Sequence, residues 1–87
     1  MSEFIYVLEN PSMPGLVKIG RTDRSVSERV NELSSHTGIP TGFAVVKHWA
    51  VTDSAVAERI IHARLSVYRL SNNREFFKIS APDPTWV

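Results

Sequence analysis

The stretch that decides the fold is Phe4–Thr22, FIYVLENPSMPGLVKIGRT. It contains two short runs of apolar, aromatic and β-branched residues, FIYVL and LVKIG, of the kind that form strands. The segment between them holds two prolines, an asparagine and a glycine, which are typical of a loop. The stretch therefore predicts two short strands joined as a hairpin.

Alternation along the two strands divides the hairpin into two faces. One parity carries only aliphatic side chains and is the expected core face: Ile5, Val7, Val17 and Ile19. The other parity carries Tyr6, Lys18 and Gly20. A symmetric hairpin centred near Ser12 would pair Tyr6 with Lys18, so that a phenol, an ammonium group and a bare glycine share one patch. Because a soluble domain has little structural reason to gather these three, we expect the functional site there.

Length and composition describe one small domain. The chain has 87 residues and no cysteine, which excludes a disulfide framework and thiolate chemistry. It contains no transmembrane span, and its N-terminus lacks the layout of a signal peptide, so we expect a cytoplasmic (intracellular) protein that does not contact membranes. The net charge of +1 argues against nucleic-acid binding through bulk charge alone. Seven arginines against three lysines still favour a local phosphate-binding patch.

Two amphipathic helices are predicted after the hairpin. The first begins at an S-x-x-E capping box with Ser25 as N-cap and ends near Ser34 or His36. The second follows three consecutive N-cap candidates, Thr52–Ser54, and carries an apolar stripe over residues 56–65.

Two further segments predict strands, namely Phe43–Val51 and Glu75–Ile79. The resulting order β-β-α-β-α-β predicts an α+β fold, with a small central antiparallel or mixed sheet of three to four strands flanked by helices. We expect one domain over residues 1–80 and an irregular C-terminal tail over residues 81–87, which contains two prolines.

The hairpin resembles the paired motif of the GIY-YIG nuclease superfamily. Ile5-Tyr6 matches the first half, and Lys18–Thr22 matches the second half of a small phage and bacterial branch, in which that half reads K-I-G-R-T. The resemblance extends to about Ile79. It implies the same small antiparallel sheet flanked by helices and a DNA endonuclease that uses one Mg²⁺ or Mn²⁺ ion. The chain departs from the founding pattern at Phe4, which replaces a glycine, and at Lys18, which replaces a tyrosine.

The resemblance assigns roles to three residues. Glu58 on the second helix would hold the metal ion, whereas by itself it would be a solvated surface charge. Arg29 would stabilise the extra negative charge on the reacting phosphate, and the alternative is an arginine that shields the apolar stripe of its helix. Tyr6 would lie beside the attacking water and either accept a proton or orient that water. Otherwise it is a strand aromatic with its hydroxyl in water.

The candidate site includes five further residues: Lys18, Gly20, Arg21, Arg24 and His62. We expect Lys18 to be a cation that grips phosphate, because a water-accessible hairpin gives little desolvation to lower its pKa. Gly20, Arg21 and Arg24 are the expected nucleic-acid contacts, with solvent exposure as the alternative for Arg21. His62 lies one turn beyond the expected metal ligand and would contact the scissile phosphate or act as a base.

The last segment of the resemblance is R-E-F-F, Arg74–Phe77. Its glutamate, Glu75, is expected to pair with a nearby arginine rather than to act in catalysis. The resemblance also implies that Asn72 or Asn73 approaches the metal, although a turn into a strand explains both asparagines equally well.

Three functions stay open from the sequence. The first is a metal-dependent DNA endonuclease, in which Tyr6, Lys18, Gly20, Arg29 and Glu58 converge on one surface concavity. The second is a nucleic-acid-binding module that kept the fold and is weak or inactive as an enzyme, as the lysine in place of tyrosine and the near-neutral charge suggest. The third is a small structural or protein-interaction domain. DNA is the expected partner, and a homodimer is an open alternative to a monomer.

Overall fold

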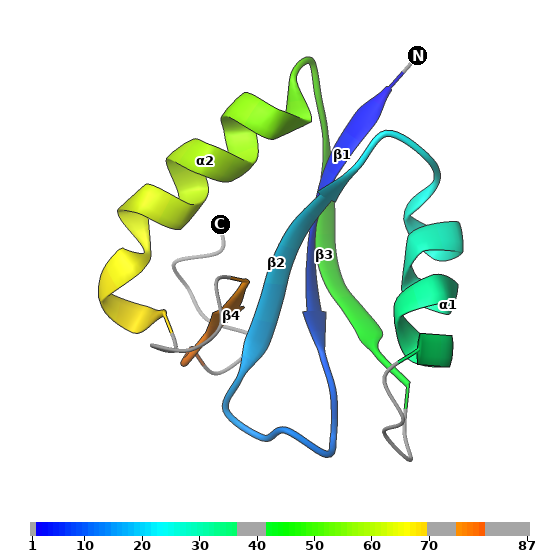
Figure 1. Ribbon diagram of the computed structural model, residues 1–87, viewed down its shortest axis with the longest axis vertical. Helices are drawn as coiled ribbons and strands as arrows, with labels where there is room; N and C mark the ends of the chain where they lie inside the picture. The colour runs from blue at the N-terminus through cyan, green and yellow to red at the C-terminus, as the bar shows by residue number, and fades with distance from the viewer. Residues whose placement is uncertain (1, 37–41, 70–74, 80–87) are drawn as a thin grey trace.

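Four antiparallel strands form the centre of the structure, in the order β3-β1-β2-β4 (Figure 1). The structure is a computed structural model that describes residues 2–36, 42–69 and 75–79. The strands are β1 (Glu3–Glu9), β2 (Val17–Thr22), β3 (Ala44–Val51) and β4 (Phe76–Phe77). The predicted hairpin is present as the β1–β2 pair, and the α+β fold class is confirmed.

Two helices cover opposite faces of this sheet (Figure 1). They are α1 (Val26–His36) and α2 (Ser54–Arg64), and α2 leads into a short 3-10 helix, η1 (Ser66–Tyr68). The Ser25 hydroxyl accepts a hydrogen bond from the Glu28 amide at 3.2 Å, as the capping box predicts. Of the three N-cap candidates before α2, the N-cap is Asp53, whose carboxylate accepts from the Val56 amide at 3.2 Å.

The last strand is shorter than the sequence predicts. It was expected over Glu75–Ile79 and is limited to Phe76–Phe77, because only Val17 and Lys18 of β2 pair with it. The predicted tail, residues 81–87, lies outside the described residues, so the domain boundary at residue 80 stays a prediction. None of the helices in the described parts of the chain has the length and apolar character needed to cross a bilayer.

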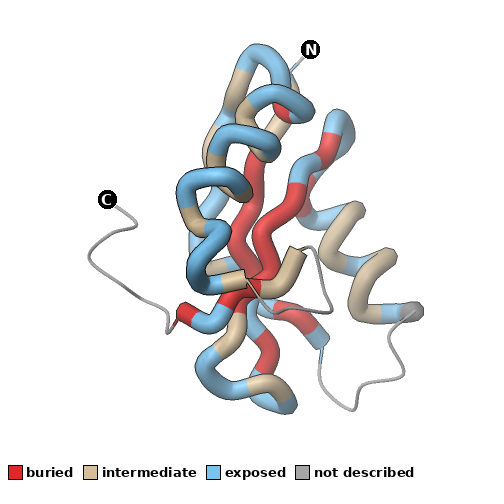
Figure 2. Tube along the Cα trace, turned by 60° about the vertical axis from the view of Figure 1, so that its left-hand side comes forward, coloured by how far each residue is buried: buried red, intermediate tan, exposed pale blue. Residues whose placement is uncertain are grey.

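Both faces of the sheet are buried, and Figure 2 shows the buried residues concentrated in the strands, while much of the helix surface is exposed. The α2 side of the sheet buries Ile5, Val7, Val17, Ile19, Phe77 and Ile79. The α1 side buries Tyr6, Leu8, Val26 and Phe43. Each fully buried aliphatic or aromatic side chain stabilises the fold by about 1.5–3 kcal/mol. The expected core face is confirmed, but the second face of the hairpin is a second core rather than an open patch.

The hairpin register differs from the predicted one. Tyr6 pairs with Gly20 and Leu8 pairs with Lys18, whereas the sequence analysis paired Tyr6 with Lys18. The reason is the loop over residues 10–16, which is centred on Met13 rather than on Ser12. A turn in which the Met13 amide donates to the Asn10 carbonyl at 2.9 Å fixes this loop. Each side chain still faces the predicted side of the sheet, because moving the centre of the loop by one residue shifts the partner of each residue by two.

Gly20 is required by the ring of Tyr6, which lies directly over it. A Cβ atom at position 20 would come within 2.5 Å of the Tyr6 hydroxyl and 2.7 Å of the ring carbon that bears it. Tyr6 is only 1% exposed, so its ring has little room to move away. The glycine of the second motif therefore allows the phenol to cross the neighbouring strand.

The start of β1 is tied to the start of α2. The Glu3 carboxylate accepts two hydrogen bonds from Ser54, one from its amide at 2.9 Å and one from its hydroxyl at 2.6 Å. These bonds lower the pKa of Glu3 below its ordinary value of 4.5, and the bond from the hydroxyl has the larger effect. The nearby charge of Arg21 lowers the pKa further. The carboxylate also lies at the N-terminal end of α2, where a negative charge is favoured.

We expect Gly20→Ala to lower the free energy of unfolding by about 1–3 kcal/mol, because the added methyl group overpacks the Tyr6 ring. Urea denaturation measures this free energy. In the Tyr6→Phe background the same substitution should cost less, since the atom closest to the new methyl group is gone. An equal cost in both backgrounds would show that the Tyr6 hydroxyl is not what requires glycine.

The Glu3 carboxylate should make stability depend on pH in the acidic range. Because its folded pKa is depressed, its contribution is fully present above about pH 4.5, the unfolded value, and is lost as the pH falls through the folded pKa. Glu3→Gln should therefore be less stable than the wild type at pH 6, and this difference should shrink at pH 3 and below, as measured by urea denaturation. Glu9→Gln, which removes an exposed carboxylate at the other end of β1, is the matched control and should reproduce the wild-type profile. A Glu3→Gln profile parallel to the wild type would contradict the prediction.

Candidate functional site

A polar cleft of about 310 Å³ lies where side chains from the two helices meet beside β2. It is lined by Arg21, Thr22, Asp23, Arg24, Arg29, Glu58 and Glu75. Because β4 pairs only with the start of β2, the second half of β2 has no further strand beside it among the described residues. Side chains from helices on opposite faces of the sheet can therefore meet at this edge. Four of the predicted site residues, Arg21, Arg24, Arg29 and Glu58, line this one cleft.

Tyr6 reaches the cleft from the core. The guanidinium group of Arg29, which lines the cleft from α1, interacts with the Tyr6 hydroxyl. Burial raises the pKa of Tyr6 above its ordinary value of 10.0, and the Arg29 charge offsets only part of this. The interaction with Tyr6 raises the pKa of Arg29 further above its ordinary value. The pair is thus a neutral phenol and a permanent cation at neutral pH.

Arg21 is oriented by the buried start of α2. Its Nη1 donates to the Ser54 hydroxyl oxygen at 3.1 Å, and Ser54 is completely buried. Because the Ser54 hydroxyl proton is donated to Glu3, its oxygen is free to accept from Arg21. The arginine itself is exposed and lines the cleft. The hydrogen bond to the buried Ser54 therefore orients Arg21, which is a predicted phosphate contact.

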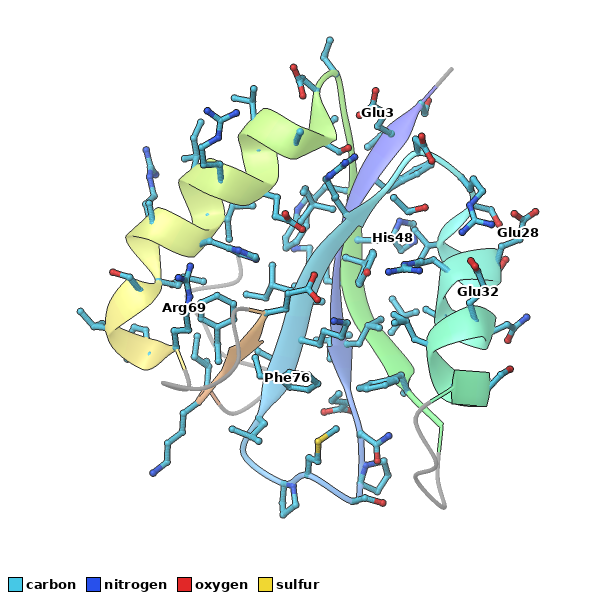
Figure 3. All side chains as sticks on the ribbon, in the orientation of Figure 1. Glu3, Glu28, Glu32, His48, Arg69 and Phe76 are labelled. Atoms are coloured by element: carbon cyan, nitrogen blue, oxygen red, sulfur yellow. The ribbon has the colours of Figure 1, made fainter. Side chains whose placement is uncertain are left out.

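Arg24 has a partner of its own. Its Nη2 contacts both carboxylate oxygens of Glu32, which extends from α1 and is labelled in Figure 3. Both side chains are exposed, so this pair contributes little to stability and can open when a stronger anion approaches. Arg24 is therefore a weaker candidate for a phosphate contact than Arg21.

Lys18 differs most from its predicted role. It is only 6% exposed, and its Nζ lies 2.7 Å from the Glu75 carboxylate and 5.3 Å from the centre of the Phe76 ring. Figure 3 shows Phe76 beside β2, and it packs against the core that α1 covers. The expectation of a water-accessible lysine is wrong, because β4 and Leu8, its neighbour across the hairpin, cover it. Its charge is neutralised by Glu75 instead of facing the cleft.

Glu75 is the site residue that the sequence analysis missed. The sequence analysis expected it to pair with an arginine. In the structure its carboxylate pairs with Lys18, interacts electrostatically with Arg29 and lines the cleft. The amide of Ile19 donates to the Glu75 carbonyl at 2.9 Å, which holds this residue against β2. The available signal in the sequence was the R-E-F-F segment, which follows the second helix and the turn signal after it. Asn72 and Asn73, the other candidates in this region, lie outside the described residues.

Glu58 is half-buried on α2 and lines the cleft together with Glu75. Carboxylate oxygens are the ligands that Mg²⁺ accepts, so this donor set fits a hard divalent ion. The described residues contain no group of three or more side chains of the kind that hold a metal ion. An ion held by Glu58 would therefore take most of its ligands from water and from phosphate oxygens, as Mg²⁺ commonly does.

His62 does not line this cleft. Its Nε2 lies 2.9 Å from the Ile19 carbonyl oxygen, and its ring packs on Phe77 with the ring centres 5.2 Å apart. Since a carbonyl oxygen only accepts, Nε2 carries the proton and donates it. His62 faces a neighbouring groove along α2, whose wall also includes Glu58. The structure therefore gives His62 a contact with β2 in addition to its place beside Glu58.

The five residues expected to converge do so in part. Arg29 and Glu58 line the cleft, and Tyr6 joins it through its interaction with Arg29. Gly20 lies against the Tyr6 hydroxyl, which occupies the space that a side chain at position 20 would need. Lys18 does not line the cleft, but its partner Glu75 does.

Comparison with known families gives one match. A model of the T5orf172 domain matches residues 3–84, which is nearly the whole chain. No curated protein and no solved structure matches the chain. The chain therefore belongs to the T5orf172 domain family, a phage-associated domain related to the GIY-YIG nucleases, and this membership indicates a nuclease or a DNA-binding module.

Proposed function

We propose that this protein is a metal-dependent endonuclease of the GIY-YIG type, from the branch with the K-I-G-R-T motif, that hydrolyses phosphodiesters in DNA. The observation that carries the proposal is that Arg29 and Glu58, from helices on opposite faces of the sheet, line one cleft, where Arg29 also interacts with the Tyr6 hydroxyl. A neutral phenol, a fixed cation and a carboxylate are three groups that metal-assisted attack of water on phosphorus can use. Membership in a nuclease-related family supports the same conclusion.

The charge balance of the cleft explains why a metal would be needed. Three arginines and three carboxylates line it, the latter being Asp23, Glu58 and Glu75. A phosphate entering this cleft would meet nearly as much negative as positive charge. Glu58 is the proposed ligand for Mg²⁺ or Mn²⁺. A bound divalent ion would neutralise the scissile phosphate and stabilise the leaving oxygen.

The chain's own residues supply the remaining steps. Arg29 would donate hydrogen bonds to a nonbridging phosphate oxygen and stabilise the charge that grows as water attacks phosphorus and the bond to the leaving oxygen breaks. Arg21 would hold the same phosphate or the next one. Because burial raises the pKa of Tyr6, the phenol stays protonated at neutral pH. Of its two proposed roles, orienting the attacking water is therefore favoured over accepting its proton.

A DNA-binding module without turnover is the second candidate. The burial of Lys18 favours it, since this residue stands where the founding motif has a tyrosine and is held by Glu75 away from solvent. Incubating the protein with labelled linear, nicked and branched DNA, with and without Mg²⁺ or Mn²⁺, separates the two. Nicking that requires metal supports the endonuclease. A salt-sensitive mobility shift without products supports the binding module, and the absence of both contradicts each of them.

Glu58→Gln keeps the shape of the side chain but removes the charge that a hard cation needs. Removing a side chain that only hydrogen-bonds to a metal ligand already costs roughly 10–100-fold in activity, so losing the ligand itself should lower the cleavage rate at least as much. The thermal midpoint should change little, because Glu58 is only half-buried and no ion pair is found for it among the described residues. The matched control is Glu28→Gln, an exposed glutamate of α1 outside the cleft. Retained cleavage would remove Glu58 from the site, and a large loss of stability would make it a structural residue.

Lys18→Met tests the role that the sequence assigned to this lysine. A phosphate contact would lower the salt dependence of DNA binding by about one ion. Because Lys18 is buried against Glu75, we expect the salt dependence to stay unchanged and the protein to lose stability, since the substitution breaks the ion pair of the buried lysine. The two measurements are DNA affinity at two salt concentrations and urea denaturation. A weaker salt dependence of DNA binding at unchanged stability would show that Lys18 does contact phosphate.

A further inference from the structure

A second groove runs along α2 and shares Glu58 with the first cleft. Its volume is about 560 Å³, and it is lined by Ala55, Glu58, Arg59, His62, Ala63, Ser66 and Arg69. Ala55, Glu58, His62 and Ser66 are spaced three or four residues apart, and Arg59 and Ala63 follow directly after Glu58 and His62. These six residues therefore form one face of α2 that continues into η1. A ligand that occupies the first cleft at Glu58 can therefore continue into this groove without leaving the surface.

Apart from Glu58, the ionisable side chains that line the groove are basic. Two arginines and a histidine line it, and Glu58 is its one carboxylate. Arg59 is exposed and forms no ion pair within residues 2–36, 42–69 and 75–79. If Glu58 binds a metal ion, as proposed above, its negative charge is compensated and the groove attracts anions.

Arg69 is held in place before any ligand arrives. Its guanidinium group lies over the Phe77 ring, 5.6 Å from the ring centre, and its Nη2 donates to the His62 carbonyl at 3.3 Å. Figure 3 labels Arg69 near the C-terminal half of α2 and β4. Stacking on an aromatic ring fixes the plane of an arginine while leaving edge N–H groups able to bind phosphate oxygens. Its Nε is buried and has no hydrogen-bond partner among the described residues.

We propose that this groove is a second phosphate-binding subsite, in which Arg59 and Arg69 hold the DNA backbone beyond the phosphate that lies at Glu58. The assignment rests on the proposed function, because it is the shared Glu58 wall that directs a strand from one hollow into the other. It also explains how a chain of net charge +1 binds a polyanion. A few arginines are concentrated along one path instead of being spread over the surface.

The test compares two arginines of the same helix. Arg59→Gln removes a charge from the groove, and Arg64→Gln removes an equal charge from an exposed arginine that lines an apolar hollow instead. Binding of a fluorescent DNA oligonucleotide is measured by anisotropy, with Ca²⁺ in place of Mg²⁺, across a salt series. Losing one phosphate contact lowers the slope of log K against log salt by about 0.7–0.9, so the fall in affinity between 50 and 200 mM salt becomes roughly threefold smaller. We expect this for Arg59→Gln and the wild-type slope for Arg64→Gln.

Arg69→Lys provides the second variant, because it keeps the charge but loses the planar group that stacks on Phe77. It should weaken binding of long oligothymidylates more than binding of short ones, which occupy only the first cleft. The thermal midpoint identifies any loss of folding. Equal effects on both lengths in a folded variant would contradict the proposed place of Arg69.

The outcomes separate this inference from the proposed nuclease. If Arg59→Gln and Arg64→Gln behave alike while Glu58→Gln abolishes cleavage, the subsite is wrong and the endonuclease stands. If Arg59→Gln alone lowers the salt slope and no DNA is cleaved with any metal, the subsite stands and the endonuclease is wrong. The absence of salt-sensitive DNA binding in the wild type would overturn both.

Discussion

The structure depends on the contact between the Tyr6 ring and the backbone of Gly20. The loop centred on Met13 pairs Tyr6 with Gly20, and this pairing can pack because only glycine leaves space for the phenol on the neighbouring strand. The contact buries Tyr6 in the core beneath α1 while leaving its hydroxyl within reach of Arg29. Since a slip of one residue would move every side chain of a strand to the other face, the same contact separates the two cores and places the proposed reacting groups.

The position of the site follows from the shortness of β4. A sheet with a helix on each face keeps the side chains of the two helices apart, and they can meet only around an edge. Because β4 pairs with two residues of β2, the remainder of β2 provides that edge among the described residues. Arg29 from α1 and Glu58 from α2 then line the same cleft. A longer last strand would cover the edge and divide the site.

Charge pairing decides which basic residues are available to a ligand. Lys18 is neutralised by Glu75, and Arg24 shares a carboxylate with Glu32. Arg21 instead donates to the hydroxyl oxygen of Ser54, and Arg29 interacts with the hydroxyl of Tyr6, so neither arginine forms a salt bridge among the described residues. The distinction is physical, since a carboxylate competes with phosphate for the same donors, whereas a neutral hydroxyl leaves the cation free to attract an anion.

The sequence by itself determined the order of the elements, the hairpin, the aliphatic core face and the start of the first helix, and it limited the N-cap of the second helix to three residues. It also named most residues of the cleft, through the resemblance of its motifs. These features are local, because strand alternation and helix capping depend on neighbours a few residues away. Only the tertiary structure decided the hairpin register, which a loop centred on Met13 sets, and the environment of Lys18. The partner of that lysine, Glu75, lies 57 residues further along the chain, and no local pattern specifies which distant carboxylate a buried cation will meet.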